Sequence, residues 1–368
     1  MADHETLGID RATFGAVRDH FQRHHYGDRS YRHLPGYRRQ LERGTVLIGD
    51  TAVRGFPKIP RTLVLETGIP RHFQDTVVVE EKLDGYNTRV VDIDGILAFS
   101  RGGMVCPFTT AKVEQLLDLE PFFDDHPDLM VCGEMVGPEN PYSPSDYPGI
   151  ESLGFRAFDI RDRESGTPLP VDERRERCEA YDIPMVPFHG RFSVENAATE
   201  IHRLIDGLDR EGREGVVMKS PDGTQLLKYT TSSANQGDLA YAFSLPFDYG
   251  QDFMFRRIIR EAFQSVEWDE DRSAAKERAR GLGESILLPM IETVQTIDDG
   301  GRVGEEHTVR AAPTVIDDLF DHLRDQGLHL DIEEDRMVDG QRVVTFMKKT
   351  QATNDKTRAY LDGRVVKE

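Results

Sequence analysis

The chain has 368 residues and a formal net charge of −20, with 66 acidic side chains against 46 basic ones. A chain of this length can form two or three domains whose cores need no metal or disulfide. Its three cysteines include no CxxC pair, which argues against a zinc site or a disulfide framework. Because we find no membrane-length apolar run and no signal peptide, we expect a protein of the reducing cytoplasm that enters no membrane.

A net negative charge ordinarily argues against a nucleic-acid partner. The basic residues, however, are 36 arginines and only 10 lysines, and the acidic residues are spread along the whole chain. This pattern favours a halophilic protein, because concentrated salt screens charge repulsion over a few Å. On that hypothesis the net charge says nothing about partners, and the positions of the few lysines become informative.

The first predicted domain, residues 1–60, contains the basic and aromatic run HFQRHHYGDRSYRHLPGYRRQLERG. His24 and His25 are adjacent, and adjacent residues on a helix point apart, so a metal site is not favoured there. The mixture of arginine and tyrosine leaves a contact with RNA open. We expect a solvated helical arm instead.

Residues 61–245 predict an α+β catalytic domain. Val77–Val79 form one strand and Thr88–Ile93 the next, and VVDIDGILAFS predicts a hairpin around Asp94 and Gly95. Strands are also expected at DLMVCGEM, FRAFDI, GVVMK and LLKY, and helices at 172–181 and 193–208. Strands that arrive in pairs favour antiparallel sheets over a doubly wound sheet. No GxGxxG or GxxxxGK[ST] motif occurs, which argues against Rossmann and P-loop nucleotide binding.

From residue 246 the pattern becomes helical, and residues 246–305 are expected to form a separate helical domain. An apolar stripe there is either a core face or a subunit interface; it consists of Phe255, Ile258, Ile259, Ala262 and Phe263. Residues 306–368 predict a small α/β domain. It comprises a helix with Val315, Leu319 and Leu323 on one face, two strands at 328–336 and 341–347 around Asp339–Gly340, and a helix near 351–361.

Three of the ten lysines lie at predicted strands of the catalytic domain: Lys82, Lys219 and Lys228. A lysine can lose its proton when it is desolvated or lies beside other cations, whereas an arginine stays charged, so lysines retained in an arginine-rich chain are candidate nucleophiles. Lys112 begins a predicted helix and is expected to be solvated. Lys82 opens a K-x-D-G motif with Asp84 and Gly85, which by itself indicates only a surface turn.

Further motifs follow K-x-D-G in a fixed order: SRGG with Arg101, a strand-end Glu134, an aromatic strand with Phe158, REGVVMK with Glu214 and Lys219, and LLKY with Lys228. This series resembles the covalent nucleotidyltransferase superfamily, which includes ATP-dependent DNA ligases, RNA ligases and mRNA capping enzymes. KLDGYN with Asn87, the upstream RGFPKIPR, and GPENPY are similar to the archaeal homodimeric class of ATP-dependent RNA ligases. DNA ligases and capping enzymes usually carry arginine at the position of Asn87 and continue into an OB-fold.

The resemblance implies a nucleotidyltransferase core, an ATP-grasp-like ligase domain of antiparallel sheets with flanking helices. A helical dimerisation domain and the small C-terminal domain would follow this core. Lys82 would attack the α-phosphate of ATP and retain AMP as a phosphoramidate, which requires a lowered pKa for Lys82. Lys219 and Lys228 would help to lower it and would stabilise the developing charge. Glu214 would bind Mg²⁺ or Mn²⁺, which prefer carboxylate and phosphate oxygens.

The remaining roles are likewise implied by the resemblance. Glu134 would bind the ribose and Phe158 would stack on adenine, while Glu80 would accept a hydrogen bond from the adenine amino group. Asp84 and Gly85 would belong to the nucleotide site, and Asn87 and Arg101 would contact ribose or the substrate's phosphates. The expected protein is a homodimeric ATP-dependent RNA ligase that joins 5′-phosphate and 3′-hydroxyl RNA ends, with intramolecular sealing into circles open to it.

Other interpretations remain open. Phe158 could be a core residue, Glu214 a loop charge, Lys228 a solvated strand end and Arg101 a turn residue. The chain could be a DNA ligase or a GTP-dependent capping-type enzyme. It could also be a non-catalytic dimer that binds RNA or nucleotide, although such a protein would have no need to retain Lys82, Glu214, Lys219 and Lys228.

Overall fold

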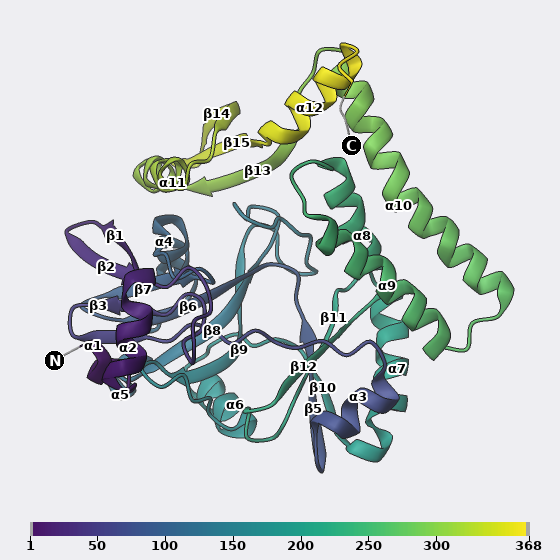
Figure 1. The fold of residues 1–368 in the computed structure, drawn as a ribbon. Coiled ribbons are helices and arrows are strands. Elements are labelled where there is room, and N and C mark those ends of the chain that lie inside the picture. Colours follow the sequence, from purple (N-terminus) through teal and green to yellow (C-terminus); the bar gives the residue numbers. More distant parts are fainter. Residues whose placement is uncertain (1–2, 366–368) are drawn as a thin grey trace.

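Four antiparallel sheets organise the chain (Figure 1). The computed structural model describes residues 3–365, in which one sheet belongs to the N-terminal region, two to the middle and one to the C-terminal region. This arrangement confirms the predicted α+β class with antiparallel sheets and flanking helices. No helix within residues 3–365 combines the length and the apolar character that a membrane crossing needs.

The N-terminal region begins with α1 (Asp3–Thr6), α2 (Arg11–Val17) and η1 (Arg18–His20). A meander of four strands follows: β1 (Gln22–Tyr26), β2 (Arg29–His33), β3 (Val46–Ile48) and β4 (Thr51–Val53). The predicted helical arm is therefore wrong from Gln22 onward. Alternate residues of β2, Tyr31 and His33, are buried, and Tyr31 packs edge-on against Phe99 at 6.3 Å. A period of two favours a strand, and the charged residues between the buried ones hide it.

The first central sheet has the order β10 (Phe188–Ser193), β5 (Thr76–Lys82), β11 (Gly215–Lys219) and β12 (Leu226–Thr230). Helices α3 (Leu65–His72) and α7 (Val194–Arg210) share a core with it. Val77 and Val79 point into this core because alternate strand residues face the same side, and Ile201 and Ile205 meet them from successive turns of α7. The predicted strands here and the predicted helix 193–208 are confirmed.

The second central sheet has the order β7 (Ile96–Ser100), β6 (Tyr86–Asp92), β8 (Leu129–Val136) and β9 (Gly154–Asp162). The β6–β7 turn holds Asp94 and Gly95 at φ values of 52° and 114°, which confirms the predicted hairpin. Around this sheet lie α4 (Pro107–Leu116), α5 (Glu120–Asp125) and α6 (Val171–Ala180). The predicted helix 172–181 corresponds to α6.

Three helices follow the two central sheets: α8 (Ser232–Ser244), α9 (Gln251–Glu267) and α10 (Arg272–Asp298). The helical segment thus starts before the predicted residue 246, and the side chain of Thr231 caps it by accepting from the backbone of Ala234. A polar network holds these helices together, since the buried carboxylate of Glu261 accepts hydrogen bonds from Ser232, Asn235 and Arg278. A helix anchored by polar contacts has no clear apolar period, which explains why the prediction missed α8.

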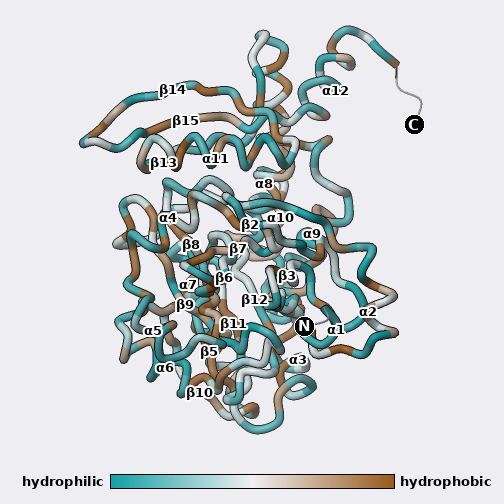
Figure 2. Tube along the Cα trace, turned by 90° about the vertical axis from the view of Figure 1, so that its left-hand side faces the viewer, coloured by the Kyte–Doolittle hydropathy of each residue, from teal (hydrophilic) through white to brown (hydrophobic). Residues whose placement is uncertain are grey.

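The C-terminal region folds back onto the second central sheet. It contains β13 (Gly304–Ala311), α11 (Pro313–Asp325), β14 (Leu330–Val338), β15 (Gln341–Lys349) and α12 (Gln351–Leu361), with sheet order β13-β15-β14. The predicted strand pair and both helices are confirmed. Figure 2 shows this module above α4, and its buried residues join the core of the second central sheet. Its side chains also reach the loop after β8, as Arg310 contacts Glu139 at 2.9 Å and Lys348 donates to the carbonyl of Pro141 at 2.6 Å.

Candidate active site

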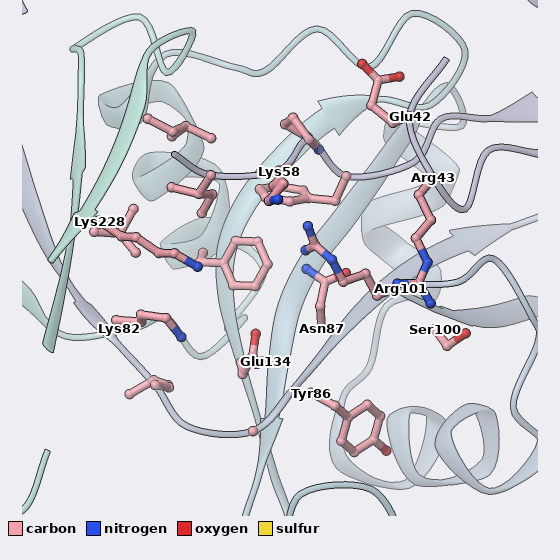
Figure 3. A pocket seen from close by; sticks show the side chains of 18 of the residues that line it. Glu42, Arg43, Lys58, Lys82, Tyr86, Asn87, Ser100, Arg101, Glu134 and Lys228 are labelled. Atoms are coloured by element: carbon pink, nitrogen blue, oxygen red, sulfur yellow. The ribbon is translucent and has the colours of Figure 1, made fainter. Parts of the chain in front are cut away.

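The two central sheets enclose a cavity of about 1270 Å³ (Figure 3). Strands β5, β6, β8, β9, β11 and β12 all contribute side chains to its wall. Nine of the eleven predicted site residues line it: Glu80, Lys82, Gly85, Asn87, Arg101, Glu134, Phe158, Lys219 and Lys228. The fold therefore brings together motifs that lie up to 148 positions apart, from Glu80 to Lys228.

Lys82 ends strand β5 and lies beside Glu214. The antiparallel register pairs Lys82 with Gly215, so the residue before β11 is placed next to the lysine. The Nζ atom of Lys82 donates to Oε2 of Glu214 at 2.6 Å. Gly215 is needed there because its φ is +142° and a Cβ would lie 2.3 Å from the carbonyl of Tyr229.

The K-x-D-G turn lies directly against strand β8. A Cβ on Gly85 would come within 2.2 Å of the carbonyl oxygen of Met135, so only glycine permits this approach. From the loop after β8, the hydroxyl of Ser145 donates to the backbone carbonyl of Asp84 at 2.6 Å. These contacts hold the turn beside Glu134, so the motif is part of the cavity wall and not a free surface turn.

The predicted lowered pKa of Lys82 is wrong for the ligand-free protein. Burial lowers the pKa of Lys82, but the negative charges of Glu214, Glu134 and Asp84 outweigh burial and raise it above its ordinary value. Lys82 is therefore held as an ammonium ion by its ion pair with Glu214. A neutral amine can form only when this pair is broken or its charge is offset.

The lysine with the strongly lowered pKa is Lys228. Burial, followed by the neighbouring cations Lys82 and Arg61, lowers the pKa of Lys228 to about 7. Glu134 shifts in the opposite sense, because burial and the nearby carboxylates raise its pKa to about 8 despite Lys82. Glu134, Glu214 and Asp84 thus place several carboxyl groups around Lys82. A further cation would be stabilised among them.

Lys219 and Glu80 belong to a buried ion cluster. Oε2 of Glu80 lies 2.8 Å from Nζ of Lys219 and 3.1 Å from a guanidinium nitrogen of Arg174. Both cations also donate to the backbone carbonyl of Phe158 on β9. Burial is the largest influence on Glu80, but the two cations outweigh it and lower its pKa to about 2. Both Glu80 oxygens accept from cations, so its predicted contact with adenine stays a prediction.

Phe158 and Asn87 both line the cavity from strands of the second central sheet, β9 and β6. The ring of Phe158 packs edge-on against Phe56 at 5.1 Å and lies 6.0 Å from the ammonium group of Lys219. Asn87 pairs with Glu134 across strands β6 and β8. Its Oδ1 atom is buried and accepts no hydrogen bond, which fits a polar ligand group in the cavity.

Known proteins match this arrangement along the chain. A model described as RNA ligase matches residues 75–230, and one described as the C-terminal region of the ligase Pab1020 matches residues 241–364. Two solved structures described as archaeal ATP-dependent RNA ligase, forms 1 and 2, each have a TM-score of 0.93 and 40% identity. Each comparison covers 99% of this chain and 98% of the other. The chain belongs to the archaeal ATP-dependent RNA ligase family.

Two further proteins resemble this member of the RNA ligase family. An uncharacterized protein of Methanocaldococcus jannaschii is 42% identical over 337 residues, covering 88% of this chain and 85% of its own. A putative ATP-dependent DNA ligase from Aquifex aeolicus has a TM-score of 0.90 at 26% identity and covers 97% of this chain and 99% of its own. The shared architecture therefore extends well beyond the catalytic domain.

The site residues of this ligase fit a divalent cation only together with a substrate. Within residues 3–365 no group of three or more histidine, cysteine or acidic side chains is arranged to hold a metal ion alone. The charge of Glu214 nevertheless raises the pKa of both Asp84 and Glu134, and Asp84 also raises that of Glu134, so the three carboxyl groups interact. This donor set suits a hard cation that completes its shell with phosphate oxygens and water.

The structure also corrects one residue and adds others. Lys112 is in the middle of α4 and buried, not solvated, and its ammonium lies 5.6 Å from the centre of the Phe108 ring. Tyr37, Arg43 and Lys58 line the cavity although the sequence analysis gave them no role. For Lys58 a signal existed, because it is one of only ten lysines and lies within RGFPKIPR.

The two unequal lysines give a chemical test on the ligand-free ligase. At about pH 8, an amine with a pKa of about 7 is roughly nine-tenths neutral, so a limiting amount of acetic anhydride should acetylate Lys228 well ahead of Lys82. Glu214→Gln removes the main charge that holds the Lys82 proton and should accelerate its acetylation. Peptide mass spectrometry measures both rates, with exposed Lys276 as the internal reference. Faster acetylation of Lys82 than of Lys228 in the unaltered protein would contradict the assigned protonation states.

Proposed function

We propose that this member of the family is an ATP-dependent RNA ligase that joins 5′-phosphate and 3′-hydroxyl RNA ends through a lysyl-AMP intermediate. The observation that carries the proposal is the position of Lys82 at the end of β5, paired with Glu214 at 2.6 Å inside a cavity that Lys228 and Phe158 also line. The amine would attack the α-phosphorus of ATP, forming a phosphorus–nitrogen bond as pyrophosphate leaves. The AMP would then pass to an RNA 5′-phosphate, and a 3′-hydroxyl would displace it.

The attacking amine must first lose its proton. Glu214 is the hydrogen-bonded group within reach of Lys82, so it controls when the amine becomes neutral. Mg²⁺ or Mn²⁺, held by Glu214 together with substrate phosphates, would offset the phosphate charge. Lys228 would stabilise anionic oxygen as a point charge once an anion beside it favours its protonated form.

The walls of the cavity suit a purine nucleotide. Phe158 would stack on adenine, and Glu134 would hydrogen-bond the ribose. Asn87 has an unused acceptor in Oδ1 that could take a ligand hydroxyl, and Arg101 would contact ribose or phosphate. Glu80 would serve adenine recognition from the Lys219 cluster, and Asp84 and Gly85 would keep the loop against the nucleotide. A cytoplasmic location, where the buried thiols Cys106, Cys132 and Cys178 stay reduced, completes this assignment.

A label-transfer experiment tests the reaction. Incubation with α-labelled ATP and Mg²⁺ should attach label to the protein, and a chase with 5′-phosphorylated single-stranded RNA should move it to the RNA. Lys82→Ala should abolish labelling. Lys82→Arg should abolish it too, because arginine can keep the ion pair with Glu214 but does not lose its proton. Lys276→Ala, at an exposed lysine of α10, is the matched control and should label normally.

The same experiment separates the alternatives. Label from GTP alone would indicate a capping-type enzyme. Transfer to nicked DNA and not to RNA would indicate a DNA ligase, which the Aquifex aeolicus likeness keeps as the second candidate. A protein that takes no label in any salt would be a non-catalytic nucleotide- or RNA-binding protein, and an Ala variant that still labels would show that Lys82 is not the nucleophile.

A homodimer through the helical region is also part of the proposal. Within the described chain, α9 and α10 expose large apolar side chains that a soluble monomer rarely leaves uncovered: Phe255, Phe263, Val266, Leu287, Leu288, Ile291 and Val294. Of the predicted stripe, Ile258 and Ile259 are half-buried, while Phe255, Ala262 and Phe263 are exposed. The outward part of the stripe therefore supports the interface interpretation over the core interpretation.

Sedimentation velocity tests the dimer. The unaltered protein should sediment as a dimer, and Phe263→Glu should shift it towards monomer because a charge would be buried in the interface. Met337→Glu places the same charge at an exposed apolar residue of β14 and should leave the dimer intact. A single monomeric species of the unaltered protein at every salt concentration would remove the proposal.

Salt dependence of stability tests the halophilic interpretation. With a net charge of −20, the folded chain repels itself, and added KCl should raise the unfolding midpoint because it screens that repulsion. Calorimetry or circular dichroism over a KCl series measures the shift, with sucrose of equal osmolality as the control that screens no charge. A midpoint independent of KCl would contradict the interpretation.

A further inference from the structure

The cavity has a second cationic end. Arg43 lies in the loop between β2 and β3, Lys58 follows β4, and Arg101 lies in the turn after β7. In Figure 3, Arg43 and Ser100 lie on the side of the cavity away from Lys82 and Lys228, with Arg101 and Asn87 between the two ends. Three separate segments therefore bring positive charges to the part of the cavity that extends from its middle to the side away from Lys82.

These cations form no ion pair with a carboxylate of the described residues. No carboxylate of residues 3–365 forms an ion pair with Arg43, Lys58 or Arg101, although ion pairs are frequent elsewhere in the chain. Glu42, in the same wall, lies 3.7 Å from Arg54 instead. Burial lowers the pKa of Arg101, the nearby charge of Glu134 raises it, and Arg43 lowers it further, so the two guanidinium groups oppose each other. In a chain with 66 acidic residues, such an unpaired set indicates a site for an anionic ligand.

The chemistry of this end suits a terminal phosphate. Guanidinium groups bind phosphate oxygens in pairs, and a lysine adds a compact point charge. Tyr37 lines the same cavity with 63% of its surface exposed, and an exposed aromatic ring is a side chain on which an unpaired base stacks. The cavity of about 1270 Å³ also exceeds the roughly 300–1,000 Å³ typical of a pocket for one small ligand.

We propose that Arg43, Lys58 and Arg101 form the subsite for the 5′-phosphate of the RNA strand, and that Tyr37 stacks on its first base. The inference rests on the proposed function and assigns the substrate end of the same cavity. An oxygen of the bound 5′-phosphate attacks the α-phosphorus of lysyl-AMP. A phosphorus–oxygen bond forms, the phosphorus–nitrogen bond to Lys82 breaks, and the released amine takes up a proton.

Arg43→Ala and Tyr37→Ala test the subsite with the full-length protein, because both side chains are exposed and neither holds the fold together. Self-labelling with ATP should proceed at the unaltered rate in both variants. Transfer from the pre-adenylated protein to 5′-phosphorylated RNA under single turnover should slow by roughly 10- to 100-fold for Arg43→Ala, the range for one lost charged hydrogen bond. Arg43→Lys should recover part of this rate. Arg203→Ala, which removes an exposed arginine of α7 outside the cavity, should behave as the unaltered protein.

A binding measurement without ATP reads the subsite separately from catalysis. The unaltered protein should bind 5′-phosphorylated RNA more tightly than the same RNA with a 5′-hydroxyl, and Arg43→Ala should abolish that preference. If the protein does not label itself with ATP, the proposed function is wrong. The preference for 5′-phosphorylated RNA over 5′-hydroxyl RNA still tests the subsite in that case. Equal loss of affinity for both RNAs would overturn the subsite in favour of general attraction. Self-labelling of Arg43→Ala could instead be slow, recover at high ATP concentration, and be followed by normal transfer from the pre-adenylated protein. That result would assign Arg43 to the ATP triphosphate and would also overturn the subsite.

Discussion

The buried ion cluster of Glu80, Lys219 and Arg174 fixes the geometry on which the rest of the site depends. These three side chains are at most 4% exposed and come from β5, β11 and α6. Isolated charges at such depth would be costly, and only complete pairing makes them tolerable. Because Lys219 and Arg174 also donate to the carbonyl of Phe158 on the other sheet, the cluster ties the two central sheets together. Lys82, two residues beyond Glu80, thereby lines the same cavity as Phe158.

One cavity gives three lysines three different electrostatic environments. Lys219 is buried and paired with Glu80, so its charge is used to hold the wall. Lys82 is paired with Glu214, and this pairing raises the pKa of Lys82. Burial and neighbouring cations lower the pKa of Lys228 to about 7. The same residue type thus holds the wall together at Lys219 and has opposite pKa shifts at Lys82 and Lys228, according to its partners alone. Motif spacing cannot distinguish these environments, because it does not say which carboxylate reaches which lysine.

Local patterns predicted most of the central fold and the membership of the site. Runs of β-branched residues located β5, β6 and β11, and the Asp94–Gly95 pair located a hairpin, since these signals depend on neighbours in sequence. Strands β1 and β2 were missed because arginines and histidines interrupt their apolar period. Lys112 was misjudged because its helix α4 shares a core with the distant α11, which reaches it only when the C-terminal region folds back. The pairing of Glu80 with Arg174 was equally invisible, as the two lie 94 positions apart.

Residues of the N-terminal and C-terminal regions complete the wall of the cavity. This gives a physical reason why the similarity to related ligases extends over nearly the whole chain. Arg43 enters the wall from the N-terminal sheet, and Gln326 enters it from the end of α11. The C-terminal sheet also supports the loop that holds the K-x-D-G turn, since Arg310 contacts Glu139 and Ser145 of that loop donates to the carbonyl of Asp84. The RNA ligase model matches only residues 75–230, whereas the archaeal ATP-dependent RNA ligase structures align with 99% of the chain. Residues beyond the shared catalytic motifs therefore build the walls that face a substrate, and differences among such ligases are expected to concentrate there.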